Sequence, residues 1–251
     1  MTIATTAAVE TATAAASTTA PAPKVSRCPF ARLFGGASAS LATGLRERTR
    51  EAHARAEKHP LQSRLVTGRT TRAEYAAWLV QLEPIWIALD AGLRTLAQGD
   101  PRVASMLRPY HTHAPRIAAD LRYLGVEEGP RAAVTPAAKQ LAQWVEAAAQ
   151  RRDPALVGVW YVLEGSTNGG RFIARALAAG LDIPGPEGLR SQDPHGEAQR
   201  ERWTEWRDAL DAGRWGEGER VAIIDAAQRT FETLGEVMEE MERDAVVRVH
   251  A

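Results

Sequence analysis

The sequence predicts an all-α fold, built as an irregular bundle of about eight or nine helices. Apolar residues recur at intervals of three and four along most of the chain, which is the period of an amphipathic helix. No segment shows the strict alternation of a half-buried strand. Helix-starting residues, such as Thr71 with Glu74 and Pro136, and the helix-ending Gly125 separate the periodic segments.

The periodic segments define the expected elements in chain order. Pro60 and Gly68 mark turns after the first helix, and Pro84 is expected to kink the second. Residues 181–194, rich in Pro, Gly and Asp, are expected to form a loop. Helices are predicted at residues 41–59, 71–97, 101–107, 114–124, 136–150 and 156–180, through Trp203 to Leu210, and at 219–248.

Composition excludes several classes of protein. The 251 residues suit one domain with an extension, and the formal net charge is +0 with 31 basic and 31 acidic side chains. A balanced charge provides no field that attracts nucleic acid or an anionic membrane. No apolar run approaches the roughly 18 residues that a membrane span needs. The single cysteine fits a reducing compartment, so we expect a soluble, cytoplasmic protein.

The chain divides into two regions by composition. Residues 1–38 are rich in Ala, Thr and Pro, and they contain too little bulky apolar surface to offset the entropy of ordering the chain. They are expected to form a disordered N-terminal extension. Residues 39–251 carry the helical periodicity and are expected to form the helical domain.

The first predicted helix carries one histidine on its apolar face. Glu57 follows His53 by one turn, where its carboxylate can accept the Nδ1 proton and leave Nε2 free for a metal. Ala52 and Ala56 leave room beside the ring for a flat macrocycle, and Arg46 can reach a carboxylate at the edge of such a ligand. The alternative is a hydrogen-bonded core histidine, which is the commoner use of a buried imidazole.

A second unusual segment lies in the helix predicted at residues 156–180. Gly165, Gly169 and Gly170 fall in its middle, and three glycines cost a helix interior about 2 to 3 kcal/mol relative to alanine. The glycines either permit close packing of helices or let the backbone approach a flat ligand and leave space for a diatomic molecule above it.

Both segments resemble the heme oxygenase family. The run Leu45-Arg-Glu-Arg-Thr-Arg-Glu-Ala-His53-Ala-Arg-Ala-Glu57 resembles the proximal helix of these enzymes. The run Tyr161-Val-Leu-Glu-Gly-Ser-Thr-Asn-Gly-Gly170 resembles the distal helix of the bacterial, bacteriophytochrome-associated type. The resemblance implies the heme oxygenase fold for the helical domain.

The resemblance also implies roles for particular residues. It makes His53 the axial iron ligand, with Glu57 as its hydrogen-bonding partner. The expected cofactor-binding residues are His53, Arg46, Glu57, Tyr161, Arg207 and Phe231, with the two arginines at the propionates and Phe231 as an aromatic wall. The expected catalytic residues on the oxygen side are Gly165, Ser166, Gly169 and Gly170.

Two positions in the second segment depart from related enzymes. Ser166 stands where animal-type enzymes carry an aspartate that orders water, so proton delivery is expected to use hydroxyl groups, backbone groups or water. Asn168 stands where the phytochrome-associated branch commonly has leucine, which adds a polar group.

The implied function is oxidative cleavage of heme to biliverdin, carbon monoxide and ferrous iron. Heme b is then both substrate and cofactor, and O2 is the co-substrate. Electrons must come from outside, for example from a ferredoxin and its reductase, because the chain contains no flavin, nicotinamide or iron–sulfur motif. A bacteriophytochrome is a further possible partner, as the acceptor of biliverdin.

Two alternatives remain open from the sequence. One is a non-catalytic heme-binding carrier or sensor, for which Asn168 is the one indication. The other is a non-heme di-iron oxidase on the same scaffold, for which Glu83, Asp90 and Glu164 are the inward-facing carboxylates. His111 and His113 lie in a segment rich in turn residues and are expected at the surface.

Overall fold

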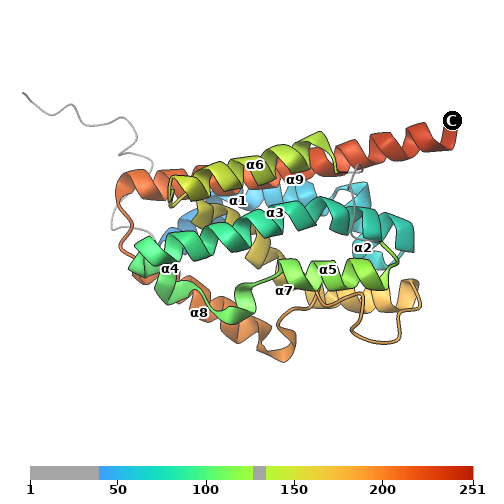
Figure 1. Ribbon diagram of the computed structural model, residues 1–251, viewed down its shortest axis with the longest axis horizontal. Coiled ribbons are helices and arrows are strands. Elements are labelled where there is room, and N and C mark those ends of the chain that lie inside the picture. Colours follow the sequence, from blue (N-terminus) through green and yellow to red (C-terminus); the bar gives the residue numbers. More distant parts are fainter. Residues whose placement is uncertain (1–39, 127–133, 251) are drawn as a thin grey trace, which may run out of the picture. The chain divides into compact units, whose positions relative to one another are not determined.

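The computed structural model describes residues 40–126 and 134–250, with side chains to residue 244. This described part forms α-helices and two short 3-10 turns and contains no strand, which confirms the all-α prediction (Figure 1). The predictions for residues 1–38 lie outside the described residues. The helices are α1 (Leu41–Glu57), α2 (Pro60–Thr67), α3 (Arg72–Gly99), α4 (Pro101–Met106), α5 (Ala114–Tyr123), α6 (Pro136–Gln150), α7 (Leu156–Gly180), α8 (Gln199–Ala212) and α9 (Glu217–His250), and the 3-10 turns are η2 (Pro109–His111) and η3 (Gly196–Ala198).

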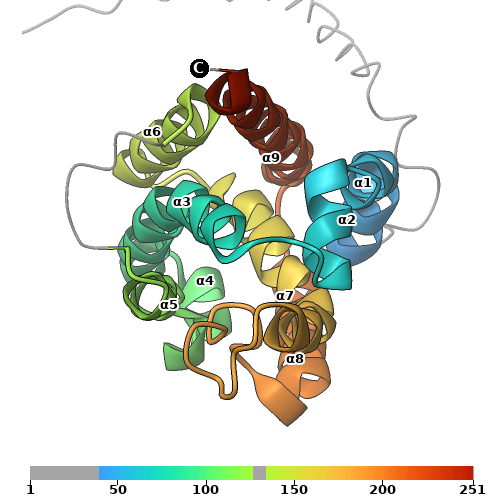
Figure 2. The same ribbon diagram turned by 90° about the vertical axis from the view of Figure 1, so that its right-hand side faces the viewer.

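The helical domain is organised around α3, α7 and α9. Helix α3 packs mainly on α6 and α5, α7 packs on α9 and α2, and α1 lies along α9. Viewed along the helices, α3 and α7 lie in the middle of the bundle, with α6, α9, α1, α8 and α5 around them (Figure 2). The largest fully buried side chains include Trp160, Trp206 and Tyr75. None of the described helices is long and apolar enough to span a membrane.

The predicted starts of α3 and α6 agree with the structure because capping residues mark them, whereas the helix predicted at residues 41–59 ends at Glu57 and the one predicted from Trp203 begins at Gln199. The hydroxyl of Thr71 accepts a hydrogen bond from the N–H of Glu74 at 3.1 Å, which begins α3 as the capping pattern predicts. Helix α3 continues through Pro84 to its end at Gly99. Helix α7 is continuous across its glycine-rich middle.

The short helix α2 is a difference from the sequence prediction, which placed two turns there. Its start carries two capping signals: His59 Nδ1 accepts the N–H of Leu61 at 3.2 Å, and Pro60 occupies the first helical position. Gly68 ends the helix with a φ of 65°, and a methyl group on it would lie 2.2 Å from the carbonyl oxygen of Ala176. Glycine therefore brings the end of α2 against α7.

Candidate active site

His53 lies on the C-terminal half of α1, beside α9. Its ring meets the ring of Phe231 edge-on, with centroids 5.6 Å apart. The prediction that His53 lies on a buried face is wrong, because 56% of its side chain is exposed. The buried residues of α1 end at Thr49. Helical spacing shows which residues share a face, but it does not show how far along the helix a neighbour covers that face.

Glu57 lies where the sequence predicts, one turn after His53. Its Oε2 atom is 3.5 Å from Nδ1 of His53, and 65% of its side chain is exposed. At this distance the carboxylate attracts the Nδ1 proton without a short hydrogen bond. A carboxylate on this side favours the tautomer with the proton on Nδ1, which leaves a lone pair on Nε2.

Tyr161 of α7 connects the two predicted segments. Burial raises the pKa of Tyr161, and a hydrogen bond with Thr49 and the positive charges of Arg207 and Arg46 offset part of this rise. Arg46 of α1 and Arg207 of α8 therefore both lie within electrostatic range of the phenol. The structure thus brings together three residues that the resemblance assigns to one cofactor.

Arg207 supports a site for an anionic group. Its guanidinium lies 5.9 Å from the ring centroid of Trp203, and its Nε atom is buried without a hydrogen-bond partner among the described residues. A buried N–H donor without an acceptor is unfavourable. A carboxylate of a bound ligand would satisfy it, which fits the propionates that the resemblance implies.

The three glycines in the middle of α7, Gly165, Gly169 and Gly170, have different surroundings. A methyl group on Gly170 would lie 1.8 Å from the carbonyl oxygen of Gln192, and one on Gly165 would lie 3.3 Å from the ring of Trp203. A methyl group on Gly169 would have no described atom within 4 Å. Close packing therefore accounts for Gly170 and limits the space at Gly165, whereas Gly169 faces open space.

The polar residues between these glycines bind to the helix itself. Ser166 is exposed, and its Oγ donates a hydrogen bond to the carbonyl of Leu163 at 2.6 Å. Asn168 Nδ2 donates to the carbonyl of Gly165 at 2.8 Å, and Asn168 Oδ1 accepts from Gln199 Nε2 at 3.3 Å. Asn168 therefore connects α7 to the start of α8.

Phe172 is a residue that the sequence analysis did not single out. It lies one turn after Gly169 on α7, and it is 67% exposed, the highest value among the large hydrophobic side chains of the described residues. An exposed phenylalanine on the same helix as an open glycine provides apolar surface for a flat ligand. Because Phe172 lies beyond Gly170, where the second motif ends, the resemblance does not mark it.

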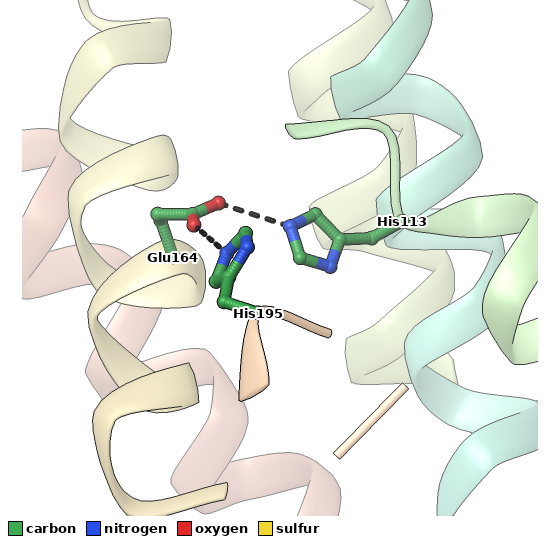
Figure 3. Close-up of side chains that lie close together, drawn as sticks. All are labelled: His113, Glu164 and His195. Carbon is green, nitrogen blue, oxygen red and sulfur yellow. Dashed lines mark hydrogen bonds and ion pairs between the residues drawn. The ribbon is translucent and has the colours of Figure 1, made fainter. Parts of the chain in front are cut away.

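A buried cluster lies on another face of α7. His113 Nε2 is 3.0 Å from Glu164 Oε2, and His195 Nε2 is 2.6 Å from Glu164 Oε1 (Figure 3). Burial raises the pKa of Glu164, but hydrogen bonds from both imidazoles outweigh it, so the pKa lies far below its usual range. Glu164 is therefore an ionised carboxylate inside the protein.

The prediction that His111 and His113 lie at the surface is wrong. They are 2% and 1% exposed, because their turn folds inward against α3. Asp90 Oδ2 accepts the backbone N–H of His113 at 3.0 Å and that of Ala114 at 2.9 Å. The sequence offered one sign of this cluster: Glu164 was expected to face inward, and a buried carboxylate requires hydrogen-bond donors from elsewhere in the chain. Sequence spacing does not show which histidines supply them.

The cluster also bears on the di-iron alternative. In the described part of the chain, His113, Glu164 and His195 are the one group of three or more side chains whose ligand atoms lie close enough for a metal ion, within 4.8 Å of one another. Glu83 and Asp90 are buried as expected, but they do not belong to this group. A single carboxylate is too few for a carboxylate-bridged di-iron centre.

Comparison with solved structures identifies the fold. The heme oxygenase of Leptospira interrogans matches with a TM-score of 0.74 and 21% identity, over 80% of this chain and 100% of that chain. Heme oxygenase-2 of Synechocystis sp. PCC 6803, solved with heme and NO, matches with a TM-score of 0.73 and 24% identity, over 82% and 86% of the two chains. The Neisseria meningitidis enzyme matches with a TM-score of 0.63 and 21% identity, over 81% and 92%. The fold is thus that of the heme oxygenases.

The sequence itself identifies the family. The family described as heme oxygenase matches residues 39–240, which is most of the chain. A search of curated proteins finds no match. The chain belongs to the heme oxygenase family, and it is an oxidoreductase that binds and degrades heme with O2.

The different surroundings of the glycines predict different effects on stability. Gly170→Ala should lower the free energy of unfolding by about 1 to 3 kcal/mol, because the backbone at Gln192 must move. Gly169→Ala should leave stability unchanged or raise it by up to about 1 kcal/mol, because alanine is the better helix former. Denaturant unfolding of the heme-free variants measures both. Equal losses of stability would contradict the assignment of Gly170 to packing.

Proposed function

We propose that heme lies between α1 and α7, with Nε2 of His53 as the axial iron ligand and Glu57 at Nδ1. The observation that carries this proposal is the exposed His53 ring, whose Nδ1 lies 3.5 Å from the Glu57 carboxylate. A neutral imidazole with a carboxylate at one nitrogen is a more basic metal ligand at the other. Phe231 contacts the edge of the same ring and provides an apolar wall.

Arg46 and Arg207 bind the propionates in this proposal. Both arginines act electrostatically on Tyr161, and Arg207 retains an unpaired buried donor. Tyr161 and Thr49 join α1 to α7 beside these arginines, so the anionic edge of the ligand lies where the two helices are linked. Phe172 adds apolar surface farther along α7.

The oxygen side is formed by Gly165, Ser166, Gly169 and Gly170. Gly169 leaves space for a diatomic molecule, while Gly165 and Gly170 let α7 pack closely on its neighbours. The Ser166 hydroxyl donates to Leu163, so its lone pairs remain to accept a hydrogen bond from water. In the proposal this water supplies protons, since no carboxylate occupies the Ser166 position.

Bound heme supplies the iron that activates O2 and is itself the substrate, with biliverdin, carbon monoxide and ferrous iron as the products. The electrons come from an external donor such as a ferredoxin with its reductase, and a bacteriophytochrome is a candidate acceptor of biliverdin. The protein acts in the cytoplasm in this proposal. The balanced net charge of +0 and the absence of any span in the described helices support a freely diffusing enzyme.

Turnover tests the proposed function against a heme carrier or sensor. The purified protein is mixed with hemin and then given a ferredoxin, its reductase and reduced nicotinamide under air. We expect loss of the Soret band, growth of the biliverdin band and release of carbon monoxide. A Soret band that persists with a competent reductant would support the carrier instead, and no Soret change on adding hemin would exclude both.

The axial ligand is tested by His53→Ala. The variant should bind heme without an axial imidazole from α1, and added imidazole should restore the wild-type spectrum, because Nε2 of His53 is the proposed iron ligand. Absorption and magnetic circular dichroism spectra measure the change. His59→Ala serves as the matched control, since this neighbouring histidine caps α2 and should not alter the spectrum. An unchanged spectrum in His53→Ala would remove the assignment.

A further inference from the structure

Three separate segments of the described chain meet at the carboxylate of Glu164. His113 precedes α5, His195 precedes η3, and Glu164 lies in α7 (Figure 3). Their exposed fractions are 1%, 6% and 2%. Each carboxylate oxygen faces one imidazole Nε2 atom, at 3.0 Å for His113 and 2.6 Å for His195. Because the three side chains are buried and within hydrogen-bonding distance, the two contacts of Glu164 have a fixed geometry.

The direction of these hydrogen bonds follows from Arg202. Its Nη1 lies 3.1 Å from Nδ1 of His195, and a guanidinium can only donate. Nδ1 of His195 therefore carries a lone pair, and the ring proton sits on Nε2, which faces Glu164. An ionised carboxylate can only accept, so Nε2 of His113 donates as well.

A metal ion is the alternative occupant of this cluster. Two imidazoles and a carboxylate within 4.8 Å match the ligands of Fe(II) and Zn sites. A metal would take the lone pair of Nε2, which would move the proton of His195 to Nδ1, where Arg202 already donates. The surroundings of the cluster therefore favour two N–H donors over two metal ligands.

The cluster lies next to the glycine segment of α7. Glu164 directly precedes Gly165, and the loop that carries His195 also places the carbonyl of Gln192 where a methyl group on Gly170 would lie. This loop therefore holds α7 at residues 164 and 170, before and after the open position Gly169. The backbone between these two contacts forms the proposed oxygen side.

We propose that Glu164 is a positioning residue of the heme site. By accepting N–H donors from His113 and His195, its carboxylate fixes the segment from Gly165 to Gly170 and with it the geometry of the oxygen side. The inference rests on the proposed function, because it assigns this segment to the oxygen side. It extends that function to a buried cluster of three side chains outside the residues assigned to the heme site.

The nearly isosteric substitution Glu164→Gln tests whether the carboxylate acts by accepting two N–H donors or only by filling the space that it occupies. An amide presents one acceptor and one donor, so its NH2 group must face one of the two imidazole N–H groups. One hydrogen bond is lost and two donors oppose each other. Glu197→Gln is the matched control, because it removes the same formal charge from an exposed ion pair with Arg171 just after His195.

The first test uses the heme-free, full-length wild-type protein. Long-range ¹H–¹⁵N NMR spectra should show a proton on Nε2 of both His113 and His195. An Nε2 atom without a proton in either ring would overturn the proposal. Zinc added to the same protein should be retained equally by wild type and Glu164→Gln. One equivalent that is bound by wild type and lost in Glu164→Gln would show a metal site instead.

The second test uses the heme-loaded variants. Glu164→Gln should shift the midpoint of the acid–alkaline absorption change of ferric heme by about half a pH unit, a roughly threefold change in the equilibrium. It should also change the ratio of biliverdin isomers, while Glu197→Gln changes neither. A lower melting temperature with an unchanged midpoint and unchanged isomers would reduce Glu164 to a structural residue.

The two tests also separate this inference from the proposed function. If the wild-type protein fails to bind heme, the proposed function fails, while the ring protons and zinc binding still report on the cluster. If Glu164→Gln fails to fold, the spectra of the wild-type rings still decide whether the carboxylate accepts two N–H donors.

Discussion

The proposed heme site depends on holding a glycine-rich helix in place. Helix α7 carries three glycines between residues 165 and 170, and side chains that would normally stabilise a helix are absent there. Its neighbours supply the constraint: Trp203 packs at Gly165, the carbonyl of Gln192 packs at Gly170, and Glu164 binds two imidazoles. The backbone at Gly169 can therefore stay exposed at the proposed site and still hold a fixed position, because contacts on the other faces of α7 fix the helix.

The two sides of the proposed heme site are built from different kinds of contact. Helix α1 lies along α9 and presents His53, whose exposed ring is bordered by Phe231 and Glu57. Helix α7 is buried against α9 and α2 and presents backbone at Gly169. Tyr161 and Thr49 link the two helices where Arg46 and Arg207 add positive charge. In the proposal, α1 supplies the imidazole that binds the iron, and α7 leaves the open space that a diatomic co-substrate needs.

Local signals in the sequence predicted most of the fold, and tertiary contacts account for what they missed. Caps such as Thr71 defined the helices, and the family resemblance identified residues that the structure brings together, including Tyr161, Arg46 and Arg207. Burial of His53 was predicted wrongly because periodicity shows which residues share a helix face but not how fully the neighbouring helices cover it. The Glu164 cluster was missed because its histidines lie in turns without periodicity, and their partner is 31 to 51 residues away.

The most direct test of this account is a crystal structure of the full-length protein with heme bound. We expect iron coordinated by Nε2 of His53, the propionates at Arg46 and Arg207, and Gly169 on the opposite face of the macrocycle. Glu164 should still accept hydrogen bonds from His113 and His195. Iron bound to another histidine, or heme away from the space between α1 and α7, would contradict the account.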